Sequence, residues 1–223
     1  MAHAALNLWL GSSPTQSEKA IQQQSTTESR HIIFTSSTLA FFPLAGYSPY
    51  TPAKAAMKSL SDTLLQEVAM HNAQYNEQHN ISPSITSSVD IKIHTLFPMG
   101  ILTPGYENEN KLKPRLTLML EKDDKPQDSD EVARIAVERL EKGDYLITTM
   151  FLGHLLRGMG MGASLRNGIV DLFWSMLGGL AVLFVVPDFV GKCRRWGREN
   201  ACESEGEARG RTSSQAERSM GKH

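Results

Sequence analysis

The chain has 223 residues, a length that predicts one domain with appendages. Charged residues make up 21% of it and the formal net charge is -1, so the composition lacks the basic footprint of a nucleic-acid-binding protein. The two cysteines, Cys193 and Cys202, lie in the polar C-terminal part, which indicates a reducing compartment and neither a disulfide framework nor a metal site.

The first thirty residues combine an apolar start with a polar segment. Residues 1–10 are apolar and helix-prone but lack the basic region of a signal peptide, so we interpret them as the end of an internal helix. Residues 11–30 are rich in Ser, Thr and Gln without any periodicity. This composition predicts a surface loop inserted into the domain.

A short apolar run, residues 31–35, ends in the small polar residues Ser36 and Ser37. A buried parallel strand that ends at a ligand crevice has this pattern. Residues 38–49 contain Gly46 and two prolines and are predicted to form the loop on the substrate side of that crevice.

A helix is predicted from Tyr50 to about Met70, followed by a polar loop over residues 71–88. Its apolar residues recur at helical spacing, and we assign them to the core: Ala56, Leu60, Leu64 and Val68.

Tyr50 and Lys54 lie four residues apart at the start of this helix, so their side chains share one face. A free phenol titrates near pKa ~10 and is a sluggish acid at neutral pH, whereas a neighbouring ammonium favours the phenolate. A serine hydroxyl from another element could bind the same substrate oxygen. The pair alone is more typical of an exposed helical Tyr and Lys with no joint role; the strand and serine before it favour a catalytic role.

A second strand is predicted over residues 90–97, with Ile91, Ile93 and Leu96 on one face. Residues 98–105 follow as a Pro/Gly turn, which places them at the carboxyl end of a parallel strand. Residues 106–127 are polar with a short Leu/Met patch, and we expect a mobile cap over the substrate.

The next predicted helix begins at Asp128 or Ser129 and ends at Gly143. One face carries apolar residues: Val132, Ile135, Ala136 and Leu140. Residues 145–147 form a third short strand. Two strand–helix units and a final strand predict an α/β fold, the C-terminal half of a doubly wound Rossmann-type parallel sheet.

The order and spacing of Ser37, Tyr50 and Lys54 resemble the short-chain dehydrogenase/reductase family. The resemblance implies that these three residues are catalytic. It also implies that Tyr50 and Lys54 contact a nicotinamide cofactor, with Lys54 on the ribose hydroxyls.

Residues 98–103 are similar to the family's Pro-Gly-x-Val-x-Thr segment, which holds the nicotinamide carboxamide. Pro98, Ile101 and Thr103 match that segment, whereas Met99 stands where the family has glycine. The resemblance therefore implies cofactor-binding roles for Pro98, Ile101 and Thr103.

The family's glycine-rich phosphate loop has one candidate, residues 158–162, which follow no clear strand and lie downstream of the catalytic residues. We interpret these glycines as a flexible or membrane-adjacent kink. We therefore expect an incomplete gene model in which residues 1–147 are a truncated catalytic domain, and we expect the 223 residues alone to bind no NADPH.

Residues 169–190 are apolar apart from Asp171 and Asp188, and would form a helix of about 33 Å. Basic residues and a tryptophan follow, as at a cytoplasmic membrane boundary: Lys192, Arg194, Arg195, Trp196 and Arg198. A buried core helix is the alternative. We predict that residues 148–198 form a membrane-associated helical region, as a re-entrant or interfacial anchor, with a two-span hairpin through residues 146–163 as second choice. Residues 199–223 are predicted to be disordered.

This anchor, together with Thr103-Pro104-Gly105, is similar to the branch of the family that reduces long-chain 3-keto sphingoid bases. The resemblance implies NADPH as cofactor, a sphingoid-base substrate and a location on the cytosolic side of the endoplasmic reticulum membrane. It leaves a homo-oligomer open. Two other hypotheses remain: a membrane-bound reductase of a steroid, retinoid or acyl lipid, and a truncated remnant without activity.

Overall fold

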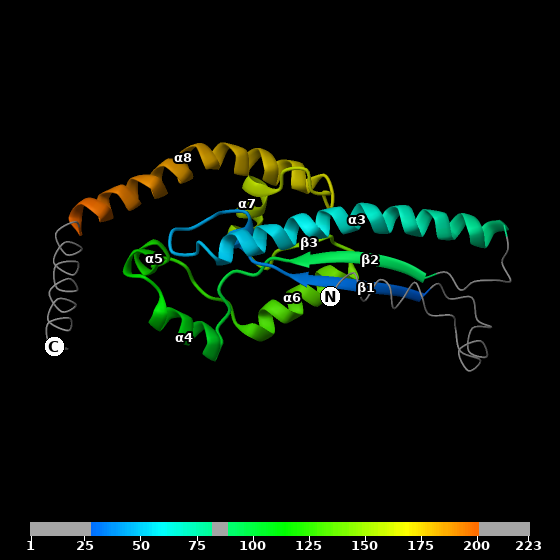
Figure 1. Cartoon of the computed structure of the whole chain (residues 1–223), viewed down its shortest axis with the longest axis horizontal. Helices are drawn as coiled ribbons and strands as arrows, with labels where there is room; N and C mark the ends of the chain where they lie inside the picture. Colours follow the sequence, from blue (N-terminus) through cyan, green and yellow to red (C-terminus); the bar gives the residue numbers. More distant parts are fainter. Residues whose placement is uncertain (1–27, 82–88, 201–223) are drawn as a thin grey trace, which may run out of the picture.

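The computed structural model describes residues 28–81 and 89–200 (Figure 1). The helix end predicted for residues 1–10, most of the predicted loop over 11–30, residues 82–88 and the predicted tail from residue 201 lie outside the described residues.

Three parallel strands form the sheet: β1 (Glu28–Thr35), β2 (Val89–Leu96) and β3 (Leu146–Ile147), in the order β1-β2-β3. Helix α3 (Tyr50–Ile81) connects β1 to β2, and α6 (Ser129–Glu141) precedes β3. Figure 1 shows α3 along one side of the strands and α6 along the other. The predicted α/β fold with a parallel sheet is thereby confirmed.

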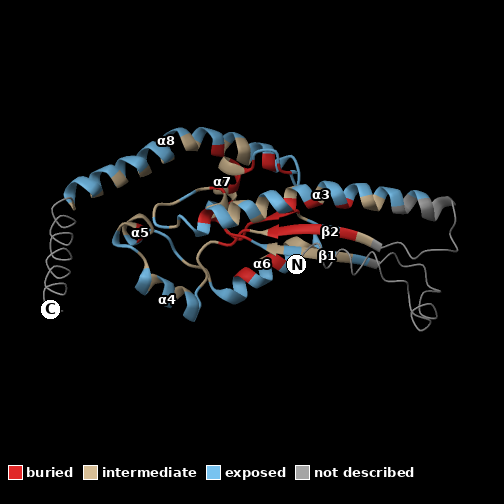
Figure 2. Ribbon diagram, in the orientation of Figure 1, coloured by how far each residue is buried: buried red, intermediate tan, exposed pale blue. Residues whose placement is uncertain are grey.

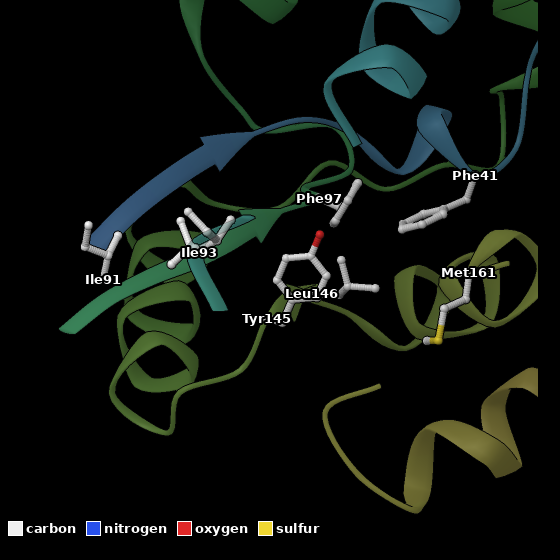
Figure 3. Close-up of a cluster of buried hydrophobic side chains, with 8 residues drawn as sticks. Phe41, Ile91, Ile93, Phe97, Tyr145, Leu146 and Met161 are labelled. Atoms are coloured by element: carbon white, nitrogen blue, oxygen red, sulfur yellow. The ribbon is translucent and has the colours of Figure 1, made fainter. Parts of the chain in front are cut away.

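The hydrophobic core lies at the carboxyl end of the sheet, where Phe97 and Leu146 are fully buried. Figure 3 shows Ile93 of β2 between Ile91 and Tyr145, with Leu146 next to Tyr145 and with Phe41 and Met161 at the other side of the cluster. Burying a side chain of this size contributes about 1.5–3 kcal/mol. Ile91 and Ile93 share a face as predicted, but Leu96 lies on the other face because side chains alternate along a strand.

Helix α3 is longer than predicted, since it continues past Met70 to Ile81. Leu64 and Val68 are buried as expected, whereas Ala56 and Leu60 are exposed, so half of the predicted apolar stripe was wrong.

A polar residue takes the core position on α3 instead. The Ser61 hydroxyl is fully buried and donates to the carbonyl of Lys58 at 2.8 Å. It also lies 3.1 Å from the Tyr145 hydroxyl, which donates to Asp62 at 2.7 Å. Burying a hydroxyl group costs little free energy when its hydrogen bonds are satisfied. For this reason hydropathy alone predicted the wrong core face for α3.

The predicted polar cap folds as two short helices, α4 (Pro104–Leu112) and α5 (Arg115–Leu120). Thr103 caps α4, because its hydroxyl oxygen accepts from the Tyr106 amide at 3.1 Å. Asp128 caps α6 as predicted, and Gly143 follows that helix with φ of 80°.

Two further helices cover the carboxyl end of the sheet: α7 (Phe151–Gly160) and α8 (Val170–Glu199). In the described part of the chain, α8 is the helix long and apolar enough to cross a membrane. Helix α7 has 10 residues, about 15 Å, so the second span of the predicted hairpin is wrong. Arg157 of α7 is buried and donates to the Leu146 carbonyl at 2.6 Å and to Asp171 of α8.

Glycines allow α7 and α8 to cross in close contact. A Cβ on Gly158 would lie 2.1 Å from the Trp174 carbonyl oxygen, and one on Gly178 would lie 2.5 Å from the Met159 amide nitrogen. Gly160 packs as closely against Phe41. Gly158 and Gly160 are therefore helix-packing positions and not a flexible kink, whereas Gly162, with φ of 58°, lies in the turn after α7.

The crossing predicts different outcomes for two adjacent glycines of α8. Gly178→Ala should lower the free energy of unfolding by about 1–3 kcal/mol, because the new methyl group meets backbone that cannot move aside. Gly179→Ala is the matched control: its Cβ has open space, so it should be neutral or stabilise by up to about 1 kcal/mol. Denaturant unfolding in a mild detergent measures both; equal effects would contradict the crossing.

Two histidines join β1 to β2. Nδ1 of His94 lies 2.7 Å from the Asp144 carbonyl oxygen and therefore donates to it, which leaves Nε2 to accept from Nδ1 of His31 at 2.9 Å. Burial, opposed by the Asp144 carbonyl, lowers the pKa of His94 below its ordinary value of 6.5. Burial also lowers the pKa of His154.

Stability should therefore fall in mild acid. The unfolded chain takes up protons near pH 6.5, before the folded His94 and His154 do, so unfolding becomes easier as the pH drops below that value. The loss should level off once the lower pKa of the folded state has been passed. His94→Asn, which keeps a donor for the Asp144 carbonyl, should show a smaller fall between about pH 7.5 and 5.5 in denaturant titrations. An unchanged slope would show that His94 is not the titrating group.

Candidate functional site

The end of β1 and the start of α3 are tied by a reciprocal pair of hydrogen bonds. The Ser36 hydroxyl donates to the Lys54 carbonyl at 3.0 Å, and the Lys54 ammonium donates to the Thr35 carbonyl at 3.1 Å. Ser36 is buried and its amide continues the ladder to the Leu96 carbonyl at 2.8 Å. This tie fixes the first turn of α3 against the carboxyl end of the strand.

Ser37 is the first residue beyond the tie, and its side chain faces a cavity. It caps the short 3₁₀ helix η1 (Thr38–Ala40), where its hydroxyl oxygen accepts from the Leu39 amide at 3.3 Å. That contact uses a lone pair of the hydroxyl and leaves its hydrogen free to donate to a ligand.

Tyr50 opens α3 and lines the same cavity, with 40% of the residue exposed. The Lys54 ammonium lies 5.4 Å from the centroid of its ring. The structure thus brings together Ser37 and Tyr50 on one cavity, with Lys54 behind the phenol. Lys54 is outside the set of residues that line the cavity.

The cavity measures about 630 Å³, within the range of small-molecule sites. Ile101 and Thr103, predicted to contact the nicotinamide, line it together with Met99. Thr103 accepts one hydrogen bond as the α4 cap and keeps its hydroxyl hydrogen free. Pro98 is not a lining residue; it is buried, and its carbonyl accepts from the Thr38 amide at 3.2 Å.

A polar group on the opposite wall was missed at the sequence level. Lys113 of α4–α5, with only 6% of its side chain exposed, donates to Glu121 at 2.8 Å and lies 3.3 Å from Glu109. The Tyr47 hydroxyl donates to the same Glu109 at 2.9 Å. The i,i+4 spacing of Glu109 and Lys113 was the available signal.

This polar group shifts two pKa values. Burial and then the Glu121 and Glu109 carboxylates raise the pKa of Tyr47, so this phenol is a poor acid. Burial lowers the pKa of Lys113, but the same two carboxylates outweigh it and the pKa is raised. Tyr47 therefore stays neutral and Lys113 stays cationic. In these forms both residues keep their contacts with the glutamates of the polar wall.

The remaining wall is apolar and comes from the segment that we predicted to be a membrane anchor. Lining residues from α7 and α8 are Leu152, Leu155, Leu156, Met159, Val185 and Phe189. Phe189 of α8 makes an edge-to-face contact with Phe42, with ring centroids 5.1 Å apart. The anchor and the site share this wall, which the sequence pattern alone did not indicate.

The arrangement suits acid–base chemistry on an amphiphilic ligand. Two hydroxyl groups, those of Ser37 and Tyr50, face a cavity whose other walls are polar on α4 and α5 and apolar on α7 and α8. Each hydroxyl can donate a hydrogen bond to a carbonyl or alcohol oxygen, and an alkyl chain would fit the apolar wall.

The family model for short chain dehydrogenases matches residues 13–93, which include Ser37, Tyr50 and Lys54. The 3-ketodihydrosphingosine reductase ksrA of Aspergillus fumigatus is 49% identical over 205 residues, covering 91% of this chain and 53% of that protein. This chain belongs to the short-chain dehydrogenase/reductase family. The match begins at residue 13, inside the segment that we predicted to be an inserted loop.

Other similarities are weaker. The 3-ketodihydrosphingosine reductase gsl-3 of Neurospora crassa is 38% identical over 173 residues, covering 77% of this chain and 44% of that protein. A short-chain dehydrogenase/reductase from Burkholderia phymatum, solved in complex with NAD, aligns with a TM-score of 0.35 at 19% identity, covering 55% of this chain and 43% of that one. The chain spans about half the length of the curated relatives it matches.

Proposed function

We propose that this chain is the catalytic and substrate-binding part of a 3-ketodihydrosphingosine reductase, which reduces a long-chain 3-keto sphingoid base to the 3-alcohol in sphingolipid synthesis. One observation supports this above the others: Ser37 and Tyr50 face a cavity whose far wall is the apolar surface of α7 and α8. The relatives at 49% and 38% identity carry this activity in their names.

In the proposed reaction, the Ser37 and Tyr50 hydroxyls donate hydrogen bonds to the C3 ketone oxygen. A nicotinamide bound beside Ile101 and Thr103 would supply the hydride to C3. Tyr50 gives its phenolic proton to the developing alkoxide, and the Lys54 ammonium, 5.4 Å from the ring centroid, stabilises the phenolate that remains. Ser37 holds the oxygen throughout and exchanges no proton.

The residues present fit the nicotinamide end of the cofactor. Ile101 and the free hydroxyl hydrogen of Thr103 border the cavity beside Tyr50. In the described part of the chain, the glycine-rich segment 158–162 packs α7 against its neighbours, so it is not the cradle for a diphosphate. We propose that the cofactor is NADPH.

The location follows from the substrate. A long-chain sphingoid base is held in membranes, and α8 offers an apolar surface beside the cavity. We place the enzyme on the endoplasmic reticulum membrane with the cavity on the cytosolic side, where the relatives' substrate would be made and NADPH is available.

Tyr50→Phe tests the proton donor. In the full-length enzyme, the variant should lose about 10²–10⁴-fold in kcat, because a positioned general acid contributes that much, while its unfolding transition stays unchanged. NADPH oxidation with the 3-keto base in mixed micelles measures the rate. Turnover near the unchanged rate would remove Tyr50 from the mechanism.

Variants of Ser37 and of its neighbour Ser36 test which serine is the second hydrogen-bond donor to the ketone oxygen. Ser37→Ala should lower kcat/KM by about 10²–10³-fold, the usual loss when one donor to a developing oxyanion is removed. Ser36→Ala removes the bond to the Lys54 carbonyl, so it should cost about 1 kcal/mol of stability with a much smaller effect on kcat/KM. The reverse ranking would assign the catalytic hydroxyl to Ser36.

A further inference from the structure

Helix α8 has two distinct faces along its whole length. Its inner stripe runs through Asp171, Gly178, Val185 and Phe189, which recur at helical spacing and contact the domain or line the cavity. The other side of the helix is exposed, as Figure 2 shows by its pale blue colour.

Contacts hold α8 against the domain at both ends. Near its start, Asp171 forms a buried ion pair with Arg157, and such a pair strongly resists separation because each charge would otherwise be buried without a partner. Further along, Gly178 packs on the backbone of α7, and Phe189 contacts Phe42. The helix therefore lies across the domain, and it could not stand upright in a bilayer without leaving the cavity.

The outer face is apolar from Val170 to Val186, about 24 Å along the helix. Its exposed residues include Phe173, Met176, Leu180, Leu183 and Phe184, with Met176 72% and Phe184 71% exposed. Phe151 of α7 extends this face, since it is exposed and its ring contacts Trp174 at 5.2 Å. Soluble surfaces rarely expose an apolar patch of this length.

The charges beside this face indicate its occupant. The last turns of α8 carry four basic residues, Lys192, Arg194, Arg195 and Arg198, and a half-buried tryptophan, Trp196. Basic residues next to an apolar helix surface are attracted to the anionic headgroups of a membrane. Because the inner face of α8 is held against the domain, we expect the helix to meet that membrane along its outer face.

We propose that α8 lies in the plane of a phospholipid membrane, with its outer face in the acyl region and its inner face forming the wall of the cavity. An amphiphilic ligand then moves from the membrane into the cavity along this wall, with its chain beside Val185 and Phe189. The orientation of α8 stands by itself; the identity of the ligand rests on the proposed function.

Two tryptophan probes distinguish this orientation from a membrane span. Phe173 and Phe184 lie eleven residues apart on the outer face, about 16 Å along the helix axis. Phe173→Trp and Phe184→Trp are introduced separately into the 223-residue chain carrying Trp9→Phe, Trp174→Phe and Trp196→Phe. Each protein is bound to vesicles of phosphatidylcholine and phosphatidylserine, and its depth is measured with lipids brominated at different positions along the chain.

We expect both probes to be quenched and to report the same depth. Val137→Trp on α6 is the control, because Val137 is an exposed apolar residue away from α8, and it should not be quenched. Depths that differ by about 16 Å would show a span, and absence of quenching at both positions would show that no membrane covers this face. Either result overturns the proposal.

The ligand route has its own measurement. In the same background, Phe189→Trp places a probe on the cavity wall, and a long-chain amine with a nitroxide at the end of its chain is added to the vesicles. The probe should be quenched well beyond the Val137→Trp control. Equal quenching would refute the route along α8. Neither measurement requires turnover, so these results stand apart from the Tyr50→Phe test of the proposed function.

Discussion

The site depends on the two hydrogen bonds that tie the end of β1 to the first turn of α3. Ser36 donates to the backbone of Lys54, and the Lys54 side chain donates back to Thr35. Because Ser37 follows one end of the tie and Tyr50 begins the helix at the other, the tie fixes where both hydroxyls face. Lys54 is held in the same step, beside the ring of Tyr50. Residues close in sequence thus build the reactive end of the cavity, and β2 supports them through the bonds from the Ser36 amide to Leu96 and from the Thr38 amide to Pro98.

The other end of the cavity is built by long-range packing. The Arg157–Asp171 pair and the glycines at positions 158 and 178 hold α8 against α7, and α8 then reaches Phe42 through Phe189. A buried ion pair and a glycine contact are both sensitive to small displacements, so they specify one position of α8. The same helix therefore serves as cavity wall on one side and as an apolar surface on the other.

Local patterns predicted the parts of this structure that depend on local chemistry. The strands before Ser36 and Pro98, the Asp128 cap and the pairing of Tyr50 with Lys54 all follow from residues close in sequence. The core face of α3 could not be predicted, because Ser61 is accepted there only through its partner Tyr145. The glycines of α7 were misinterpreted for the same reason: their purpose is contact with a helix more than ten residues away.

The polar wall and the role of α8 could not be predicted from the sequence for another reason. Glu109, Lys113 and Glu121 are unremarkable surface residues by composition, and become a wall only when α4 and α5 fold over the cavity. An apolar segment such as residues 169–190 is compatible with a span, an interfacial helix or a core helix. That Val185 and Phe189 of this segment line the cavity could be seen only in the folded chain.

The central claim is that Ser37 and Tyr50 act on one oxygen atom while the ligand's chain follows α7 and α8. A structure of the full-length enzyme with a bound long-chain 3-keto base tests this most directly. We predict the ketone oxygen within about 2.6–3.2 Å of both hydroxyl oxygens, with the alkyl chain against Leu156 and Val185. A ketone oxygen bound instead at Lys113 and Glu121, with the chain turned away from α8, would contradict it.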